Sequence, residues 1–197
     1  MSLIKLNNRS IKDVTSLPFG VGNLIHIQSQ TASNSASISF TTGINSTYKE
    51  YQFWFIDIHP RTDDVSFQFN FSTDGGSNYN VTKTSTTFIS AHQENDSYTS
   101  LSYNTGLDLA QSTSYQNISN TSNDADHIVA GYISLFNPSS TTYVKHWIST
   151  TNTTNYDDIS INLFCAGYGN TTSAINAVRF QMSSGNFDGT IALFGVV

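Results

Sequence analysis

Three aspartates in the first half of the chain are the first residues that could do chemistry. Asp57, Asp63 and Asp64 flank residues 59–61, and paired carboxylates can serve as acid and base in glycoside hydrolysis or hold a cation. Asp is also typical of turns, and sequence spacing does not place two carboxylates at a catalytic separation. We therefore interpret this segment as a solvated turn and expect no catalytic residue in it.

The histidines and the cysteine form no recognisable catalytic or metal motif. The five histidines are widely spaced and include no HExxH pair. GxSxG, P-loop and Rossmann GxGxxG sequences do not occur either. Cys165 lies in the apolar run 159–165, which favours a buried small hydrophobe over a reactive thiol. We expect no metal, no cofactor and no enzymatic activity. The histidines are His26, His59, His92, His127 and His146.

The segment 72–78, Ser-Thr-Asp-Gly-Gly-Ser-Asn, contains several oxygen ligands but lacks the regular series that ends in a bidentate Glu in calcium loops. Asp74-Gly75 stands between two strand-like runs, 67–71 and 79–84. Asp-Gly is typical of a two-residue turn with positive φ. The sequence therefore predicts a β-hairpin here.

Tyrosines in polar segments could stack on sugar rings, because an aromatic ring packs on the C–H face of a pyranose while its hydroxyl stays wet. Packing in the core or in an interface is the alternative, and it is favoured. The candidate glycan contacts are Tyr98, Tyr103, Tyr115, Tyr156 and Tyr168.

Composition excludes several functional classes. Only 11% of the 197 residues are charged, against a usual value of about 25%. Eight Lys and Arg residues and a formal net charge of −6 argue against nucleic-acid binding. No stretch approaches the roughly 20 apolar residues of a membrane span, and the N-terminus has no apolar signal core. We expect no membrane partner and synthesis in a host cytoplasm.

Alternation of apolar and polar residues is the dominant pattern. Residues 65–71 place Val65, Phe67, Phe69 and Phe71 on one face, as a half-buried strand requires. Residues 51–58 are apolar on both faces, which indicates either a central strand or one that a neighbouring subunit covers. Further candidate strands are 24–30, 37–41, 79–84, 87–91, 98–103, 128–136, 142–149, 159–166, 174–182 and 190–196.

So many short strands in one domain predict an all-β fold, a jelly-roll-like sandwich of two antiparallel sheets. We expect residues 23–197 to form this single domain. Residues 104–126, rich in Ser, Asn, Thr and Asp, are expected to form a long loop. Residues 1–22 show little periodicity and are expected to form an extended arm that anchors the domain. The apolar anchoring candidates are Ile4, Leu6, Ile11, Val14 and Leu17.

Several stretches resemble recurrent segments in small structural proteins of marine tailed bacteriophages. They are 48–55, 133–147, 166–168, 173–175 and 189–196, so the resemblance extends over most of the chain beyond about residue 24. It implies a virion component, of the capsid decoration or fibre-like kind, and brings no catalytic residues with it.

The resemblance and the composition together favour a non-enzymatic capsid decoration or cement protein on the particle surface. Its expected partners are other copies of itself, with a trimer favoured, and virion proteins such as the major capsid protein. The alternative is a tail-fibre or tail-tip protein that binds host surface glycans. A third possibility, a glycan-cleaving enzyme, would require two carboxylates facing one cleft.

Overall fold

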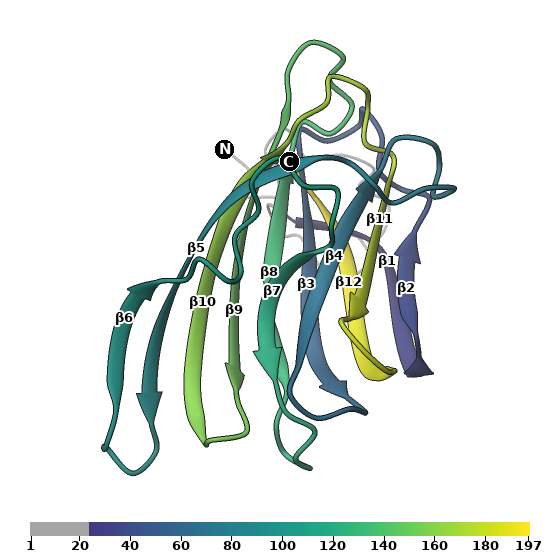
Figure 1. Cartoon of the computed structure of the whole chain (residues 1–197). Helices are drawn as coiled ribbons and strands as arrows, with labels where there is room; N and C mark the ends of the chain where they lie inside the picture. The colour runs from purple at the N-terminus through teal and green to yellow at the C-terminus, as the bar shows by residue number, and fades with distance from the viewer. Residues whose placement is uncertain (1–23) are drawn as a thin grey trace, which may run out of the picture.

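A computed structural model describes residues 24–197 as twelve β-strands without a helix, which confirms the predicted all-β class (Figure 1). Residues 24–197 accordingly contain no helix long and apolar enough to cross a membrane. The strands are β1 (Leu24–Ser35), β2 (Ser37–Phe40), β3 (Glu50–Pro60), β4 (Val65–Ser72), β5 (Lys83–Gln93), β6 (Thr99–Tyr103), β7 (Gln116–Thr121), β8 (Val129–Phe136), β9 (Lys145–Thr154), β10 (Ile159–Gly169), β11 (Ala177–Met182) and β12 (Phe187–Val196).

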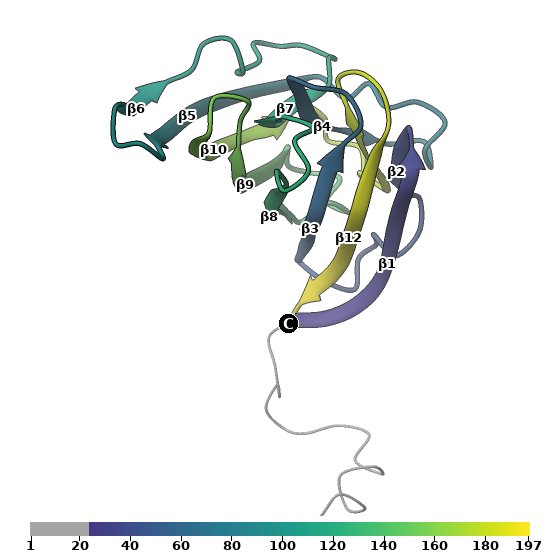
Figure 2. The ribbon, with the colours of Figure 1, turned by 90° about the horizontal axis from the view of Figure 1, so that it is seen from below.

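The strands form two antiparallel sheets. The larger has eight strands in the order β1-β12-β3-β8-β9-β10-β5-β6, and the smaller has four in the order β2-β11-β4-β7. Without β5, β6, β9 and β10, the two sheets keep the neighbour relations of an eight-stranded jelly roll. The β5–β6 and β9–β10 pairs are insertions that widen one sheet on the side of β8. The predicted sandwich is therefore confirmed, with one sheet twice as wide as the other (Figures 1 and 2).

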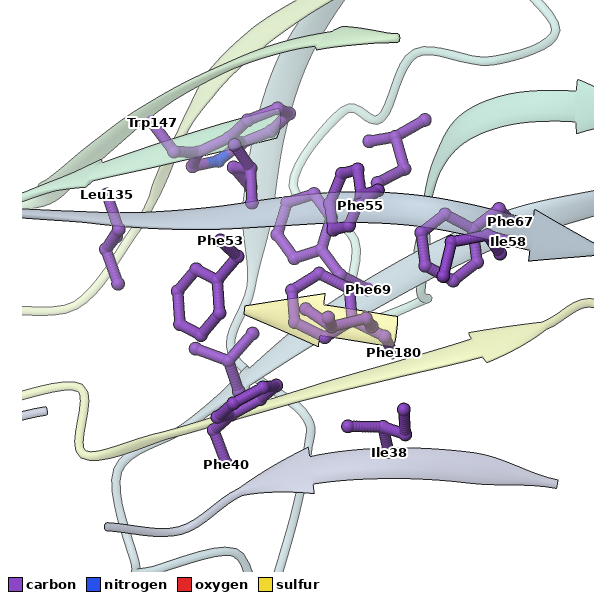
Figure 3. Packing of buried hydrophobic residues seen from close by; sticks show 14 of the residues in the cluster. Ile38, Phe40, Phe53, Phe55, Ile58, Phe67, Phe69, Leu135, Trp147 and Phe180 are labelled. Carbon is purple, nitrogen blue, oxygen red and sulfur yellow. The ribbon is translucent and has the colours of Figure 1, made fainter. Parts of the chain in front are cut away.

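Phenylalanine side chains fill the space between the two sheets. Phe180 of β11 packs against Phe53 and Phe55 of β3, with ring centroids 5.3 Å apart in both pairs. Phe55 also packs edge-to-face against Phe67 of β4 at 5.1 Å, a preferred aromatic geometry. All four rings are almost completely buried (Figure 3). The predicted alternation in β4 thus supplies one half of the core.

Strand β3 confirms the first of the two alternatives for residues 51–58, and cover by a neighbouring subunit on its outer face stays a prediction. It is a central strand, hydrogen-bonded to β12 on one side and to β8 on the other. Its inward residues Tyr51, Phe53 and Phe55 are buried, whereas Trp54 and Ile56 point to the other face of the sheet and are exposed.

The prediction of one loop over residues 104–126 is wrong in part, because residues 116–121 form β7. Only Ile118 in this strand is a large apolar residue, so the sequence carries no clear alternation of apolar and polar side chains. Polar side chains are buried there in pairs instead: the Ser85 hydroxyl donates to Gln116 Oε1 at 2.6 Å. The preceding residues run beside β5, where Ser85 N donates to the Leu109 carbonyl.

The predicted hairpin at Asp74-Gly75 is also wrong, because β4 belongs to the four-stranded sheet and β5 to the eight-stranded sheet. The expected positive φ is present, 72° at Gly75 and 91° at Gly76. The Asp74 carboxylate accepts hydrogen bonds from Ser72 Oγ and from the backbone and side chain of Asn78, and these bonds lower its pKa to about 2. The turn therefore starts a crossing between the layers.

The anchoring candidates Ile4, Leu6, Ile11, Val14 and Leu17 lie outside the described residues, as does the whole segment 1–22. The structure begins at β1, an edge strand of the eight-stranded sheet that pairs with β12.

Lys83 is the first residue of β5, and its side chain is buried. Its ammonium donates to Asn70 Oδ1 at 2.5 Å and to the Val81 carbonyl at 2.9 Å, both neutral acceptors. Burial lowers its pKa from 10.5 to about 7, because a low dielectric disfavours the charged form. The native state thus releases this proton well below the pH at which the unfolded chain does.

We predict that the free energy of unfolding rises between pH 7 and 8.5 by about 1 kcal/mol per pH unit, because the unfolded chain binds the Lys83 proton that the native state has lost. Lys83→Met should remove this rise, whereas Lys49→Met, at an exposed site, should keep it. Urea titrations at each pH measure both slopes. Equal pH dependence in wild type and Lys83→Met would contradict the assignment.

Cys165 is confirmed as a buried small side chain. It is 1% exposed on the inner face of β10, and burial raises its pKa to about 12.

We predict that the native Cys165 thiol reacts with 5,5′-dithiobis(2-nitrobenzoic acid) at pH 8 at least about 100-fold more slowly than the unfolded thiol, since the thiolate is the nucleophile. A cysteine introduced at the exposed position Thr141 should react at once. Fast labelling of native Cys165 would overturn this view of the core.

Candidate functional site

The face of the eight-stranded sheet that points away from the four-stranded sheet, here the outer face, carries aromatic side chains in register. Strand pairing places six residues side by side on six neighbouring strands, from β3 to β6, and five of them are aromatic. We call this line the aromatic row. Its members are Trp54, Tyr132, Thr150, Phe164, Phe88 and Tyr103.

The aromatic row is solvent-accessible at both ends. Trp54 is 41% exposed and Tyr103 53% exposed. Within the row, the Phe88 and Phe164 rings stack at 4.8 Å with an interplanar angle of 12°. The Tyr103 hydroxyl donates to Asp108 Oδ2 at 2.6 Å, and this bond raises the pKa of the phenol. Contact between neighbours orders these rings without removing them from water.

A shallow hollow of about 390 Å³ lies on the same face, beside the aromatic row, over β9, β10 and β5. Ala166 and Gly167 lie in its middle, and larger side chains stand around them. The His146 and Tyr168 rings are 5.8 Å apart. The candidate strands 24–30 and 142–149 contain His26 and His146, and the two residues do lie in strands, β1 and β9. The larger residues that line the hollow include Phe136, His146, Ile148 and Tyr168.

Charge is almost absent from this part of the outer face. Strands β8, β9, β10, β5 and β6 contain no Asp, Glu or Arg, and their two lysines, Lys83 and Lys145, are buried. The acidic residues of the eight strands are Glu50, Asp57 and Asp188, all in β3 or β12. A polyanion or a charged membrane surface therefore finds no opposite charge here.

The opposite outer surface, on the four-stranded sheet, differs in kind. Arg179 of β11 donates from Nε to Ser39 Oγ at 2.8 Å, and its guanidinium lies 4.0 Å from the centroid of the Tyr79 ring. Asn70 of β4 donates to the carbonyls of Tyr79 and Thr113. Hydrogen bonds and loops that cross between the sheets occupy this surface, so the apolar outer face is confined to the eight-stranded sheet.

The five candidate glycan tyrosines do not form one groove. Tyr103 and Tyr168 lie on the outer face, in β6 and β10. Tyr115 precedes β7 beside Arg179, and partial burial raises the pKa of its phenol. Tyr98 and Tyr156 lie in the β5–β6 and β9–β10 connections, and both are exposed. The five tyrosines thus lie on different strands and connections, and their separation in space cannot be read from the sequence.

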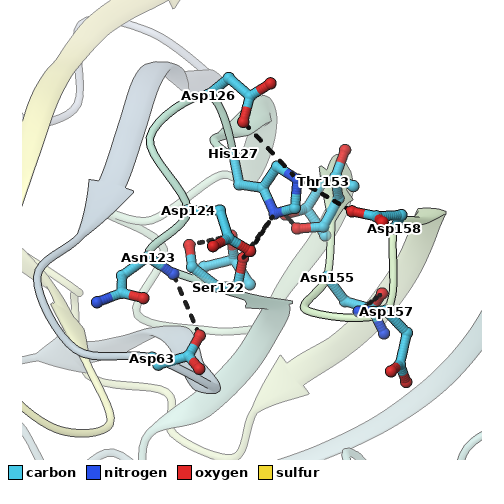
Figure 4. A network of polar contacts seen from close by, with 12 residues as sticks. Asp63, Ser122, Asn123, Asp124, Asp126, His127, Thr153, Asn155, Asp157 and Asp158 are labelled. Atoms are coloured by element: carbon cyan, nitrogen blue, oxygen red, sulfur yellow. Dashed lines mark hydrogen bonds and ion pairs between the residues drawn. The ribbon is translucent and has the colours of Figure 1, made fainter.

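A serine, a histidine and three aspartates cluster between the β7–β8 and β9–β10 turns (Figure 4). Ser122 Oγ lies 2.6 Å from His127 Nδ1 and 3.1 Å from Asp124 Oδ2, while Asp158 lies 3.7 Å from His127 Nε2. Although the arrangement resembles a Ser-His-acid triad, Ser122 is 0% exposed, so its hydroxyl cannot reach a substrate. The cluster ties two turns together.

The three aspartates singled out from the sequence are spread over a strand and a turn. Asp57 lies in β3 at a bulge, where its φ is 53°, and Gly189 of β12 is required opposite because a Cβ there would stand 2.4 Å from the Asp57 carbonyl oxygen. Asp63 and Asp64 are exposed in the β3–β4 turn, as interpreted from the sequence. Within residues 24–197, no group of three or more His, Cys, Asp or Glu side chains could hold a metal ion.

Comparisons with known proteins add no residue roles to this description. Searches against protein-family models, curated proteins and solved structures found no match to the chain. The resemblance to phage structural proteins therefore stays a prediction from sequence.

Proposed function

We propose that this chain is a non-enzymatic structural protein of a virion, a capsid decoration or cement protein that assembles through the outer face. The observation that carries the proposal is the aromatic row, because large contiguous apolar patches on a soluble protein mark interaction surfaces. The resemblance to phage structural proteins supports the virion as its location and the major capsid protein as a further partner.

The outer face approaches the size of a stable contact. The aromatic row covers five spacings between neighbouring strands, about 24 Å at about 4.8 Å each, and the strands extend it by about 20–25 Å. The projected area is roughly 500–600 Å² per copy, and side chains increase the accessible area above this value. Stable complexes bury about 800 Å² per partner. The outer face therefore approaches the required size without a contribution from residues 1–23.

The partner that fits this face is a second copy of the chain. The protein has a formal net charge of −6, so most surfaces of two copies repel one another. Strands β8, β9, β10, β5 and β6 present no exposed charge of the Asp, Glu, Lys or Arg type on this face. The central strands of two outer faces can therefore meet without like-charge repulsion, since Glu50 and Asp108 lie at the margins, and apolar burial favours the contact.

The shape of the face favours a two-fold arrangement. The exposed Trp54 lies at the β3 end of the aromatic row, and the hollow lies beside the row over β9, β10 and β5. A two-fold contact pairs each surface with itself, so Trp54 of each copy can lie against the hollow of the other. The trimer favoured from sequence requires two different contact surfaces, whereas this face supplies one. Two copies are therefore the unit that we propose.

We predict that the full chain is a dimer of twice 21.6 kDa in size-exclusion chromatography with light scattering. Trp54→Ser combined with Phe88→Ser should raise the dissociation constant at least about 100-fold, because two aromatic side chains of the row leave the interface. Tyr143→Ser, at a 70% exposed loop position outside the aromatic row, is the matched control and should remain dimeric. A wild-type chain that is monomeric at 100 µM, or a double variant that dimerises normally, would refute the proposed contact.

The virion location is tested by immunogold labelling of intact particles of the virus that encodes the chain. We predict label over the head, since a decoration protein is displayed on the capsid. Particles assembled with a chain that lacks residues 1–22 should carry no label, because this segment is the expected anchor. Label at the tail tip would favour the glycan-binding alternative, and absence of label would contradict a virion role.

A further inference from the structure

A cleft opens between the two sheets where the eight-stranded sheet extends past β7, the edge strand of the four-stranded sheet. We call it the interlayer cleft; its volume is about 260 Å³. It lies on the inner face of β5 and β10 and is therefore on the opposite side of the sheet from the aromatic row. Its lining residues are Asp64, Ile89, Asn104, Leu107, Asn120, Asn155, Tyr156, Ile161 and Leu163.

Polar groups around the cleft have unused hydrogen-bonding capacity. Asp64, Asn120 and Tyr156 all line the cleft, and their side chains are exposed or half-buried, so their polar groups can bond a ligand. Asn104 Oδ1 accepts from Gly106 N, which leaves the two amide protons of its side chain free. A carboxylate, amides and a phenol are thus available to a ligand that both donates and accepts hydrogen bonds.

The opposite wall of the cleft is apolar. Ile89, Ile161 and Leu163 face it from β5 and β10, and Leu107 closes one side. Tyr156 stands at the rim and is 53% exposed. An apolar wall with a ring of hydrogen-bonding groups matches a pyranose, whose C–H face packs on apolar or aromatic surface while its hydroxyls point outward.

Charge argues against anionic ligands, and size limits the cleft to a small one. Asp64 is the only charged residue in the lining, so the cleft repels phosphates and other anions. Within the described residues no metal-binding group includes it. The cleft volume lies just below the range of about 300 to 1,000 Å³ that is usual for drug-sized ligands, so a smaller ligand such as one sugar ring suits it.

The turn that carries Tyr156 is held in place before any ligand arrives. Asn155 Oδ1 accepts from the backbone N–H of Asp157 and of Ile159, both at 3.1 Å. The side chain of Gln93 donates to the Asp157 carbonyl, and Asp158 contacts His127 (Figure 4). A fixed turn loses little conformational entropy on binding. The Ser122–His127 cluster therefore acts as a support for the rim of the cleft.

We propose that the interlayer cleft binds one neutral pyranose ring of a glycan, with Asn120, Asn104 and Asp64 bonding its hydroxyls and Tyr156 covering its C–H face. The remainder of a longer glycan leaves through the open side. The site is separate from the outer face, so it remains available when two copies pair.

The test is saturation-transfer difference NMR of the full chain with four probes at 10 mM: methyl α-D-mannopyranoside, methyl β-D-glucopyranoside, methyl β-D-galactopyranoside and methyl N-acetyl-β-D-glucosaminide. We predict that at least one binds with a dissociation constant of roughly 0.1–10 mM, as expected for a single ring in a small site. Tyr156→Ala and Asn120→Leu should each weaken binding at least about 10-fold.

Tyr98→Ala is the matched control, because Tyr98 is an exposed tyrosine in the neighbouring β5–β6 connection and does not line the cleft. Its affinity should equal that of the wild type, as should that of the Trp54→Ser, Phe88→Ser double variant, which separates this site from the dimer contact. Unchanged thermal melting confirms that each variant folds. Failure of all four probes, or retention of binding in both cleft variants, would overturn the proposal.

Discussion

The packing of phenylalanine side chains between two sheets of unequal width is the interaction on which the rest of the structure depends. Phe53 and Phe55 from the wide sheet meet Phe67 and Phe180 from the narrow one, and this contact fixes which face of β3 points inward. Because only four strands lie opposite, the core cannot extend under β5 and β6. The inserted strands must find other cover, and both candidate binding surfaces follow from that constraint.

Beneath β5, buried polar groups join the apolar core, which extends to the inserted strand β9 through Trp147 packed on Phe69. Ser85 bonds Gln116, and the buried ammonium of Lys83 bonds Asn70 and the Val81 carbonyl. Such groups are tolerated only when paired, which makes this region more specific in its geometry than an apolar filling. Where β7 ends the narrow sheet, the pairing stops and the interlayer cleft begins. On the other side of the same strands, nothing in residues 24–197 covers the aromatic row.

Structural features that depend on the local residue pattern were predicted from the sequence, whereas features that depend on strand pairing and register were not. Alternation in residues 65–71 identified β4 and its buried face, and the number of short strands predicted the sandwich. The strand 116–121 escaped notice because Ile118 is its only large apolar side chain. The Asp74-Gly75 turn was assigned its positive φ correctly, but its flanking segments enter different sheets, which is a non-local choice. The aromatic row draws on residues from six strands and appears only when their register is known.

Intermolecular distances between spin labels test most directly whether two copies pair through the outer face. Because Cys165 is buried, one introduced cysteine can be labelled alone. Pulsed electron paramagnetic resonance on a label at Ser160, on the outer face of β10, should give one intermolecular distance of roughly 10–25 Å, since packed sheets lie about 10 Å apart. A label at Gln181, on the far side of the four-stranded sheet, should give no distance below roughly 30 Å. A shorter distance at Gln181 than at Ser160, or none at Ser160, would contradict pairing through the outer face.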